Sequence, residues 1–222
     1  LISDTINSIF FDANGTKWFG TDQGISGFRR TTWNSFSREI EYGLDTLVLR
    51  RALTIGADLQ GSLWIGTAGG GIRRNTQLGA SEHWISYIDS NGVAPNYVSG
   101  AQRDFHDDMW FSTSTGVKKF HHSGGPDEGI WTIYEPTPTT YPTAYFTAIN
   151  IEPSTGIIWC GNLFGDLVRF DGVSQWIVYP TPHHASPITS IAFESVPSSS
   201  TPLVWIVTGD GVFRFSLVQG WT

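Results

Sequence analysis

The sequence has only one cysteine and one methionine in 222 residues. A lone cysteine, Cys160, cannot form an internal disulfide, so the packed core has to hold the fold together. We expect Cys160 to be a small buried residue rather than a reactive thiol, because no base lies close to it in the sequence. The shortage of methionine and of other helix formers argues against a helical repeat.

Basic residues are also scarce, with 13 Lys and Arg against 20 Asp and Glu, which gives a formal net charge of −7. An acidic surface repels phosphate backbones, so we expect no nucleic-acid partner. The sequence lacks an apolar run of about 18 residues, so we expect no insertion into a membrane. The chain begins at Leu1 without a signal-peptide pattern, and we expect a mature or excised piece.

Glycine, proline and aromatic residues are abundant instead. The chain contains 25 Gly, 11 Pro and ten Trp, and 14% of its residues are aromatic. Glycine and proline at this level suit many short strands joined by turns. A chain of 222 residues falls within the range of one all-β domain. At this size, folding buries roughly 70% of the unfolded surface, which is enough for a sizeable core.

The stretch WFGT at Trp18–Thr21 recurs four times. The equivalent tryptophans are separated by 46, 46, 49 and 46 residues and are Trp64, Trp110, Trp159 and Trp205. A second tryptophan follows each of the five by 15 to 21 residues: Trp33, Trp84, Trp131, Trp176 and Trp221. Self-similarity at a period near 45 residues indicates a repeat architecture.

Each copy is predicted to form four short strands. In the first copy these are Thr5–Asp12, Thr16–Thr21, Gly24–Arg29 and Thr31–Ser37. Asp12-Ala13-Asn14-Gly15 forms the first turn, because Asn-Gly adopts positive φ at low cost. A glycine six positions after each repeat tryptophan indicates a second turn with positive φ, at Gly24, Gly70, Gly116, Gly165 and Gly211. In copies two and four the next apolar residue comes one position later after this glycine than in the other copies, which suggests a one-residue bulge.

A four-stranded sheet of this sequence is apolar on both faces. In the WFGT strand Trp18 and Gly20 point to one face, and Phe19 and Thr21 point to the other. Both faces must therefore meet a neighbour, and units of this length are typical of the β-propeller. The small residue two places after each tryptophan should let neighbouring units approach closely, with Val207 in copy five as the exception.

We therefore predict an all-β fold, a single β-propeller domain over residues 1–222 with five four-stranded blades. The predicted repeats are approximately 5–46, 47–94, 95–143, 144–186 and 187–222. A five-blade fragment of a larger propeller is the alternative, and a monomer is the expected state. Truncating a buried repeat tryptophan should be strongly destabilising.

The motif order of the copies resembles the two-component regulator propeller repeat. This order is a strand, D-x-x-G, W-[IF]-G-T, x-x-G and [RK]-F, and it is best kept at Asp12–Arg29 and Asp58–Arg74. The resemblance implies a bacterial, sensor-type β-propeller that is extracytoplasmic, either periplasmic or secreted, and it implies oligosaccharide ligands. Such sensors usually carry more repeats, an immunoglobulin-like domain, a membrane helix and a kinase, so we expect ligand binding rather than signalling from this chain.

Ligands of propellers usually lie where loops meet the mouth of the central channel. The loops expected there include 39–46 and 180–187, together with the turns after the WFGT strands. Aromatic, amide and carboxylate groups in these segments suit a small-molecule or glycan ligand, because rings stack on sugar C–H faces and polar groups bind hydroxyls. The candidate ligand-binding residues are Asp22, Gln23, Ser114, Tyr141, Asn162, Phe164, His183, His184 and Asp210. Ordinary solvated loops are the alternative.

The leading function is a non-catalytic binding or sensor propeller for a glycan or peptide. The acids Asp12, Asp58, Glu152 and Glu194 recur in phase, as turn residues do, and we assign no catalytic residue. The alternatives are a secreted polysaccharide-acting hydrolase or lyase and a protein–protein interaction scaffold. A lyase resembling streptogramin lyase would need a channel histidine, for which only His183 or His184 is available.

We expect no metal or cofactor. Side chains of adjacent residues diverge on a strand, so neither His121-His122 nor His183-His184 is a good chelate. The acidic run Asp104–Asp108 falls on the same turn as Asp12–Gly15, where aspartate serves the turn itself. The basic pairs Arg29-Arg30, Arg73-Arg74 and Lys118-Lys119 are predicted to form a solvated rim, with cation–π packing on the fourth-strand tryptophans as an alternative.

Overall fold

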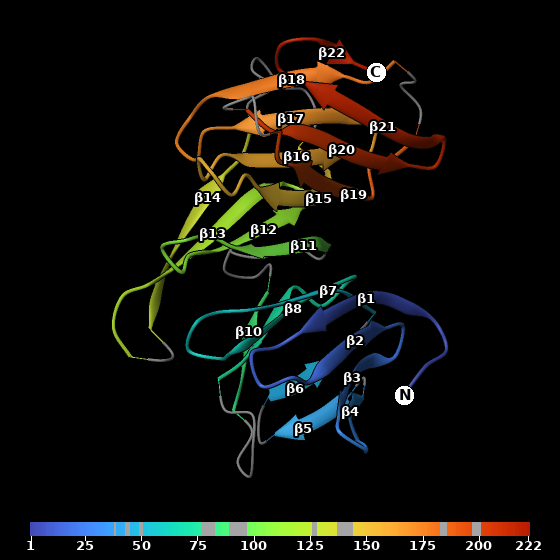
Figure 1. Ribbon diagram of the computed structural model, residues 1–222. Helices are drawn as coiled ribbons and strands as arrows, with labels where there is room; N and C mark the ends of the chain where they lie inside the picture. Colours follow the sequence, from blue (N-terminus) through green and yellow to red (C-terminus); the bar gives the residue numbers. More distant parts are fainter. Residues whose placement is uncertain are drawn as a thin grey trace. The chain divides into compact units, whose positions relative to one another are not determined.

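The computed structural model describes residues 1–37, 39–42, 45–48, 51–76, 83–88, 97–125, 128–136, 144–182, 186–196 and 201–222. Figure 1 shows five antiparallel sheets of four strands each, which we call blades 1 to 5 in chain order. The chain divides into two compact units, Leu1–Thr113 with Lys118–Ile133 and Ser114–Val117 with Tyr134–Thr222. Among the described residues, no helix has the length and apolar character that a membrane crossing requires.

The strands follow the predicted repeat. Blade 1 contains β1 (Ile6–Phe11), β2 (Lys17–Thr21), β3 (Gly24–Arg29) and β4 (Thr32–Ser37). Blade 2 contains β7 (Ala52–Ala57), β8 (Leu63–Thr67), β9 (Ile72–Asn75) and β10 (Trp84–Tyr87). Blade 3 contains β11 (Val98–Arg103), β12 (Met109–Thr113), β13 (Gly116–His122) and β14 (Gly129–Tyr134). Blade 4 contains β15 (Phe146–Ile151), β16 (Ile158–Asn162), β17 (Asp166–Phe170) and β18 (Trp176–Pro180). Blade 5 contains β19 (Ser190–Glu194), β20 (Leu203–Thr208), β21 (Gly211–Ser216) and β22 (Gly220–Trp221).

An additional hairpin occupies most of the predicted loop 39–46. It pairs β5 (Glu39–Tyr42) with β6 (Asp45–Val48) in a separate two-stranded sheet. The segment Glu39-Ile40-Glu41-Tyr42 alternates charged and apolar residues, which is the period of a strand. The loop prediction therefore missed a short strand pair.

The turns after the WFGT strands use positive φ as predicted in four copies, at Gly24 (126°), Gly116 (129°), Gly165 (87°) and Gly211 (142°). Copy two differs, because Gly69 and Gly71 adopt positive φ in place of Gly70. Its turn is longer, and the bulge suggested for the third strand is absent, since β8 and β9 pair in regular register. The pairing of β16 with β17 is also regular. Register shifts occur instead between the first and second strands of blades 1 to 4.

One hydrogen bond recurs in all five blades. The carboxylate that ends the first strand accepts the indole Nε1–H of the repeat tryptophan at 2.7–3.1 Å. The pairs are Asp12 with Trp18, Asp58 with Trp64, Asp104 with Trp110, Glu152 with Trp159, and Glu194 with Trp205. The other oxygen of Asp12 accepts the backbone N–H of Asn14 at 2.9 Å and of Thr16 at 2.8 Å. In blades 1 to 3 the acid thus holds the turn, as predicted, and in all five blades the acid also orients the indole.

Neighbouring blades within each unit bury three of the repeat tryptophans between them. Trp18 belongs to one buried cluster with Ile55, Leu63 and Ile65 of blade 2. Trp64 belongs to a second cluster with residues of blade 3, including Phe111, and Trp159 to a third with residues of blade 5. The close approach predicted at small residues is present, because a Cβ added to Gly66 would lie 2.7 Å from Val98 Cγ1.

Candidate functional site

The predicted ligand residues of blade 1 lie in the exposed turn between β2 and β3. Asp22 Oδ1 accepts the Asn7 side-chain amide at 3.0 Å and forms an ion pair with Arg51 Nε at 2.9 Å. The ion pair joins blade 1 to the segment before β7, so Asp22 already has a structural role. Gln23 is exposed, and its backbone N–H donates to Thr21 Oγ1 at 3.2 Å.

Asn162 shapes the equivalent turn of blade 4. Its side chain is buried, and its Oδ1 accepts the backbone N–H of Phe164 at 2.9 Å and of Asp166 at 2.7 Å. Its Nδ2 donates to Asp166 Oδ2 at 3.1 Å. This turn presents the Phe164 ring, which is 53% exposed. Phe164 is therefore better placed than Asn162 to contact a ligand.

The remaining predicted residues lie in different parts of the chain. Ser114 is half-buried in the turn between β12 and β13, and Asp210 is exposed in the turn between β20 and β21. Tyr141, His183 and His184 lie outside the described residues. The described candidates fall in both compact units, with Asp22 and Gln23 in the first and the other four in the second. The nine-residue set therefore stays a prediction.

The sequence interpretation missed several buried charges in blades 2 and 3. Arg73, Arg74 and Lys118 are only 4%, 0% and 1% exposed, so the solvated rim is wrong for them. Arg74 Nη2 donates to Asp58 Oδ2 at 3.1 Å, and its guanidinium lies 4.7 Å from the centre of the Trp64 ring. The cation–π partner is thus the second-strand tryptophan rather than the fourth-strand one. Only the first basic pair, Arg29-Arg30, is exposed as predicted.

A second group of charges surrounds Asp108 in blade 3. Lys119 Nζ donates to Asp108 Oδ2 at 2.9 Å, and His121 Nδ1 lies 2.6 Å from Oδ1. Burial alone would raise the pKa of Asp108, but the hydrogen bonds and charges of Lys119 and His121 lower it below its ordinary 3.8. Asp108 therefore stays ionised as part of a paired network.

His122 lies beside the buried Asp58–Arg74 pair, with its Nε2 3.5 Å from Asp58 Oδ2. Burial lowers the pKa of His122 below its ordinary 6.5, and the charge of Arg74 lowers it further. The unfolded chain then binds a proton at higher pH than the folded chain does. Stability should be unaffected above pH 6.5 and should fall as the pH drops from 6.5 through the lower folded pKa.

We expect His122→Gln to reduce the loss of stability between pH 6.5 and pH 4.5, because the amide does not titrate. The free energy of unfolding, measured by denaturant titration at both pH values, tests this. His106→Gln is the matched control, since His106 is exposed and should leave the acid-dependent loss unchanged. Equal acid sensitivity in the wild type and His122→Gln would contradict the assignment.

Cys160 is fully buried, and burial raises the pKa of its thiol well above the ordinary value. A thiol in this state is mostly protonated at neutral pH and is a poor nucleophile. This agrees with the interpretation of Cys160 as a small core residue.

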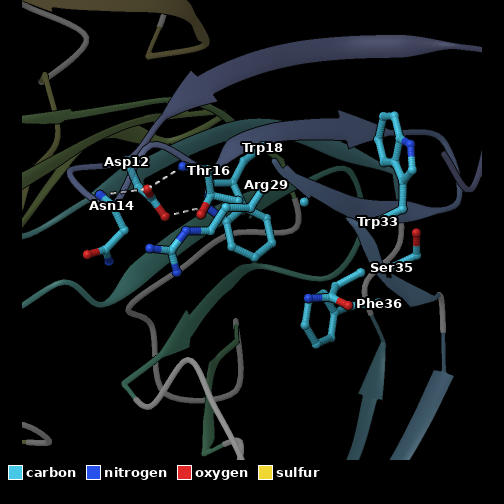
Figure 2. A pocket seen from close by; sticks show the side chains of 10 residues that line it. Asp12, Asn14, Thr16, Trp18, Arg29, Trp33, Ser35 and Phe36 are labelled. Atoms are coloured by element: carbon cyan, nitrogen blue, oxygen red, sulfur yellow. Dashed lines mark hydrogen bonds between the residues drawn. The ribbon is translucent and has the colours of Figure 1, made fainter. Parts of the chain in front are cut away.

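Blade 1 carries a cavity of about 620 Å³ on one face of its sheet (Figure 2). Charged and amide side chains line it, including Asp12, Asn14 and Arg29, beside the rings of Trp18 and Phe36. Figure 2 shows Asp12 and Asn14 at one end and Trp33 with Ser35 at the other. A cavity of this size is within the range that holds a small ligand, and the sequence interpretation did not find it.

Comparison with solved structures identifies the architecture. The extracellular domain of the hybrid two component system BT3049 from B. thetaiotaomicron superimposes over 100% of this chain with a TM-score of 0.78 and 16% identity. The extracellular domain of BT4673 from the same organism matches over 98% of the chain with a TM-score of 0.64 and 14% identity. Virginiamycin B lyase from Staphylococcus aureus, solved with quinupristin, matches over 100% with a TM-score of 0.71 and 12% identity.

The chain is a β-propeller. Its five four-stranded blades and the fold shared with BT3049 confirm the predicted fold class and the resemblance to sensor-type propellers at the level of the fold. The propeller spans 30% of the BT3049 domain, 33% of the BT4673 domain and 71% of the lyase. The sequence itself matches no protein-family model and no curated protein.

Proposed function

We propose that this propeller is an extracytoplasmic, non-catalytic sensor module that binds a small glycan or peptide. The five acids that recur at the ends of the first strands support this role, because each one accepts the indole N–H of a tryptophan. Carboxylates committed in this way are not free to act as an acid–base pair on a substrate. The fold shared with extracellular domains of bacterial sensor systems favours the same role and location.

The ligand contacts of this proposal are taken from the turns that follow the second strands, and each compact unit is considered by itself. The exposed candidates in these turns are Asp22, Gln23, Phe164 and Asp210. Phe164 supplies a ring for stacking on a sugar face, and the others supply acceptors and donors for hydroxyl groups. Tyr141, His183 and His184, in the predicted connecting loops, are proposed as further ligand contacts.

A glycan array followed by thermal-shift titration of each hit tests the proposal. We expect Phe164→Ala to weaken binding of a hit by about tenfold, since a buried aromatic contact contributes at least that much. Phe105→Ala is the control, because Phe105 is also an exposed ring but lies in the turn between β11 and β12 of blade 3, which joins the first and second strands. It should leave the affinity unchanged.

Two results would count against this role. An array of plant and microbial glycans without a hit would remove the glycan version and leave the peptide version to be tested with a peptide library. Turnover of a polysaccharide by the purified protein would replace the sensor role with the hydrolase or lyase alternative.

A further inference from the structure

A cation faces the repeat tryptophan in four of the five blades. The strand register pairs Trp64 with Arg74, Trp159 with Arg169 and Trp205 with Arg214. In blade 3, Lys119 Nζ lies 5.2 Å from the centre of the Trp110 ring. Blade 1 is the exception, because its register pairs Trp18 with Gly27.

Blade 2 shows what this cation does. Arg74 Nη2 donates to Asp58 Oδ2 at 3.1 Å and to Ser62 Oγ at 3.2 Å, while the guanidinium lies over the Trp64 ring. Asp58 Oδ2 thus accepts two donors, the Trp64 indole N–H and the guanidinium. A carboxylate, a hydroxyl and an aromatic face together form a slot for one cation.

Blade 1 keeps the walls of this slot and lacks the cation. Asp12, Thr16 and Trp18 occupy the positions of Asp58, Ser62 and Trp64, and all three line the cavity together with Gly27 (Figure 2). Asp12 Oδ2 accepts the Trp18 indole N–H at 2.9 Å, and no described residue supplies it with a second donor. Asp12 Oδ2 can therefore accept one more hydrogen bond at the position that corresponds to the Arg74 guanidinium in blade 2.

We propose that the blade 1 cavity binds a guanidinium or primary ammonium group of a ligand, which donates to Asp12 Oδ2 in the way that Arg74 donates to Asp58. The volume of about 620 Å³ exceeds that of one such group, so the rest of the ligand extends toward Asn34 and Phe36, which line the same face of the sheet. An arginine or lysine side chain of a peptide and an amino sugar share this chemistry. The site is separate from the turns proposed above to bind the sensor ligand, so either proposal can fail alone.

Among the described residues, Arg29 is the one positive charge that lines the cavity. Its side chain is exposed, and it forms no ion pair within the described part of the chain. At short range its charge opposes an incoming cation. Removing it should therefore strengthen the binding of a cation and weaken the binding of an anion, which separates the two kinds of ligand.

The experiment is a titration of the whole chain with small probes, followed by NMR of the ¹⁵N-labelled indole groups. The cationic probes are N-acetyl-arginine methylamide, N-acetyl-lysine methylamide and glucosamine, and the neutral and anionic controls are N-acetylglucosamine and N-acetyl-glutamate methylamide. We expect dissociation constants on the order of millimolar for the cations, as a few contacts to one small group give. The Trp18 Nε1–H signal, which the Trp18→Phe variant assigns, should shift when each cationic probe is added.

Two pairs of variants locate the site. Asp12→Asn should weaken the binding of the cationic probes by at least about tenfold, since a charge-assisted hydrogen bond is lost. Asp4→Asn is its control, because it removes an equal charge from an exposed site on the same segment and should change the affinity little. Arg29→Ala should increase the affinity for these probes several-fold, whereas Arg30→Ala at the neighbouring exposed position should leave it unchanged. Arg29→Ala removes an exposed side chain, so it keeps the test valid if Asp12→Asn folds poorly.

Three results would overturn the proposal. The first is that N-acetylglucosamine binds as well as glucosamine. The second is that Arg29→Ala weakens the cationic probes, which would mean that Arg29 is itself a ligand contact. The third is that none of the cationic probes moves the Trp18 signal in the wild type or in Arg29→Ala. A preference for the amino-acid probes over glucosamine would indicate a peptide as the source of the cation, and the reverse would indicate an amino sugar.

Discussion

Replacing Trp64 with alanine should lower the free energy of unfolding by about 3–5 kcal/mol, the range measured for large aromatic residues in a core. Trp64 is 0% exposed and packs against the rings of Phe111 and Phe120, with centroid distances of 5.5 and 4.9 Å. Its loss would open a cavity between blades 2 and 3. It would also remove the indole that donates to Asp58 and the aromatic face under Arg74.

Trp205→Ala is the matched control for this measurement. Trp205 has the same position in its repeat and the same acid–indole bond, but it is only half-buried. Its truncation should cost about 1–2 kcal/mol, because less apolar surface returns to water. Chemical denaturation monitored by circular dichroism gives both values. A loss below about 1 kcal/mol for Trp64→Ala would mean that this side chain does not hold blades 2 and 3 together.

The second large effect is expected for Asp58→Ala, again about 3–5 kcal/mol, because one member of a buried ion pair is removed. The side chains of Asp58 and Arg74 are both 0% exposed and lie 3.1 Å apart. The variant leaves the Arg74 charge buried without its carboxylate. It also leaves the Trp64 indole N–H and the Ser62 backbone N–H without their acceptor.

A double variant separates the charge from the packing. Asp58→Ala combined with Arg74→Leu should recover part of the lost stability, because the unpaired charge is then absent. Glu194→Ala is the matched single control, since Glu194 makes the same bond to an indole in an exposed position, and its loss should cost about 1 kcal/mol or less. An Asp58→Ala loss as small as that of Glu194→Ala would show that the buried pair adds nothing.

The fold could be predicted from the sequence because the same local signals occur five times. The strands of each blade were predicted from a tryptophan, a small residue and a turn glycine at fixed spacing. The alternating direction of side chains along a strand then indicated apolar residues on both faces of each sheet. Positive φ in copy two was predicted at Gly70 but occurs at Gly69 and Gly71, since a run of three glycines leaves open which of them adopt it. The β5–β6 hairpin was missed because it lies outside the repeat.

The candidate site was less predictable, because burial of charge depends on what the neighbouring blade presents. Arg73 and Arg74 resemble a solvated pair in one copy alone, and Arg74 is buried because blade 3 packs against the face of blade 2 that carries it. The blade 1 cavity had a usable signal, since Gly27 stands where the other copies have Arg74, Lys119, Arg169 and Arg214. That signal can be interpreted only after the structure shows that the acid, the tryptophan and the cation of one blade are in contact, as Asp58, Trp64 and Arg74 are in blade 2.

The acid and the indole that it binds always come from the same copy, only 6 to 11 residues apart in the chain. Gene duplication or loss of one whole copy would therefore leave every remaining carboxylate with its own tryptophan. Only the contacts between neighbouring sheets would then have to change, and most of the buried side chains there are apolar. Such a chain is well suited to change its number of blades during evolution without first having to invent a new interaction inside any of them.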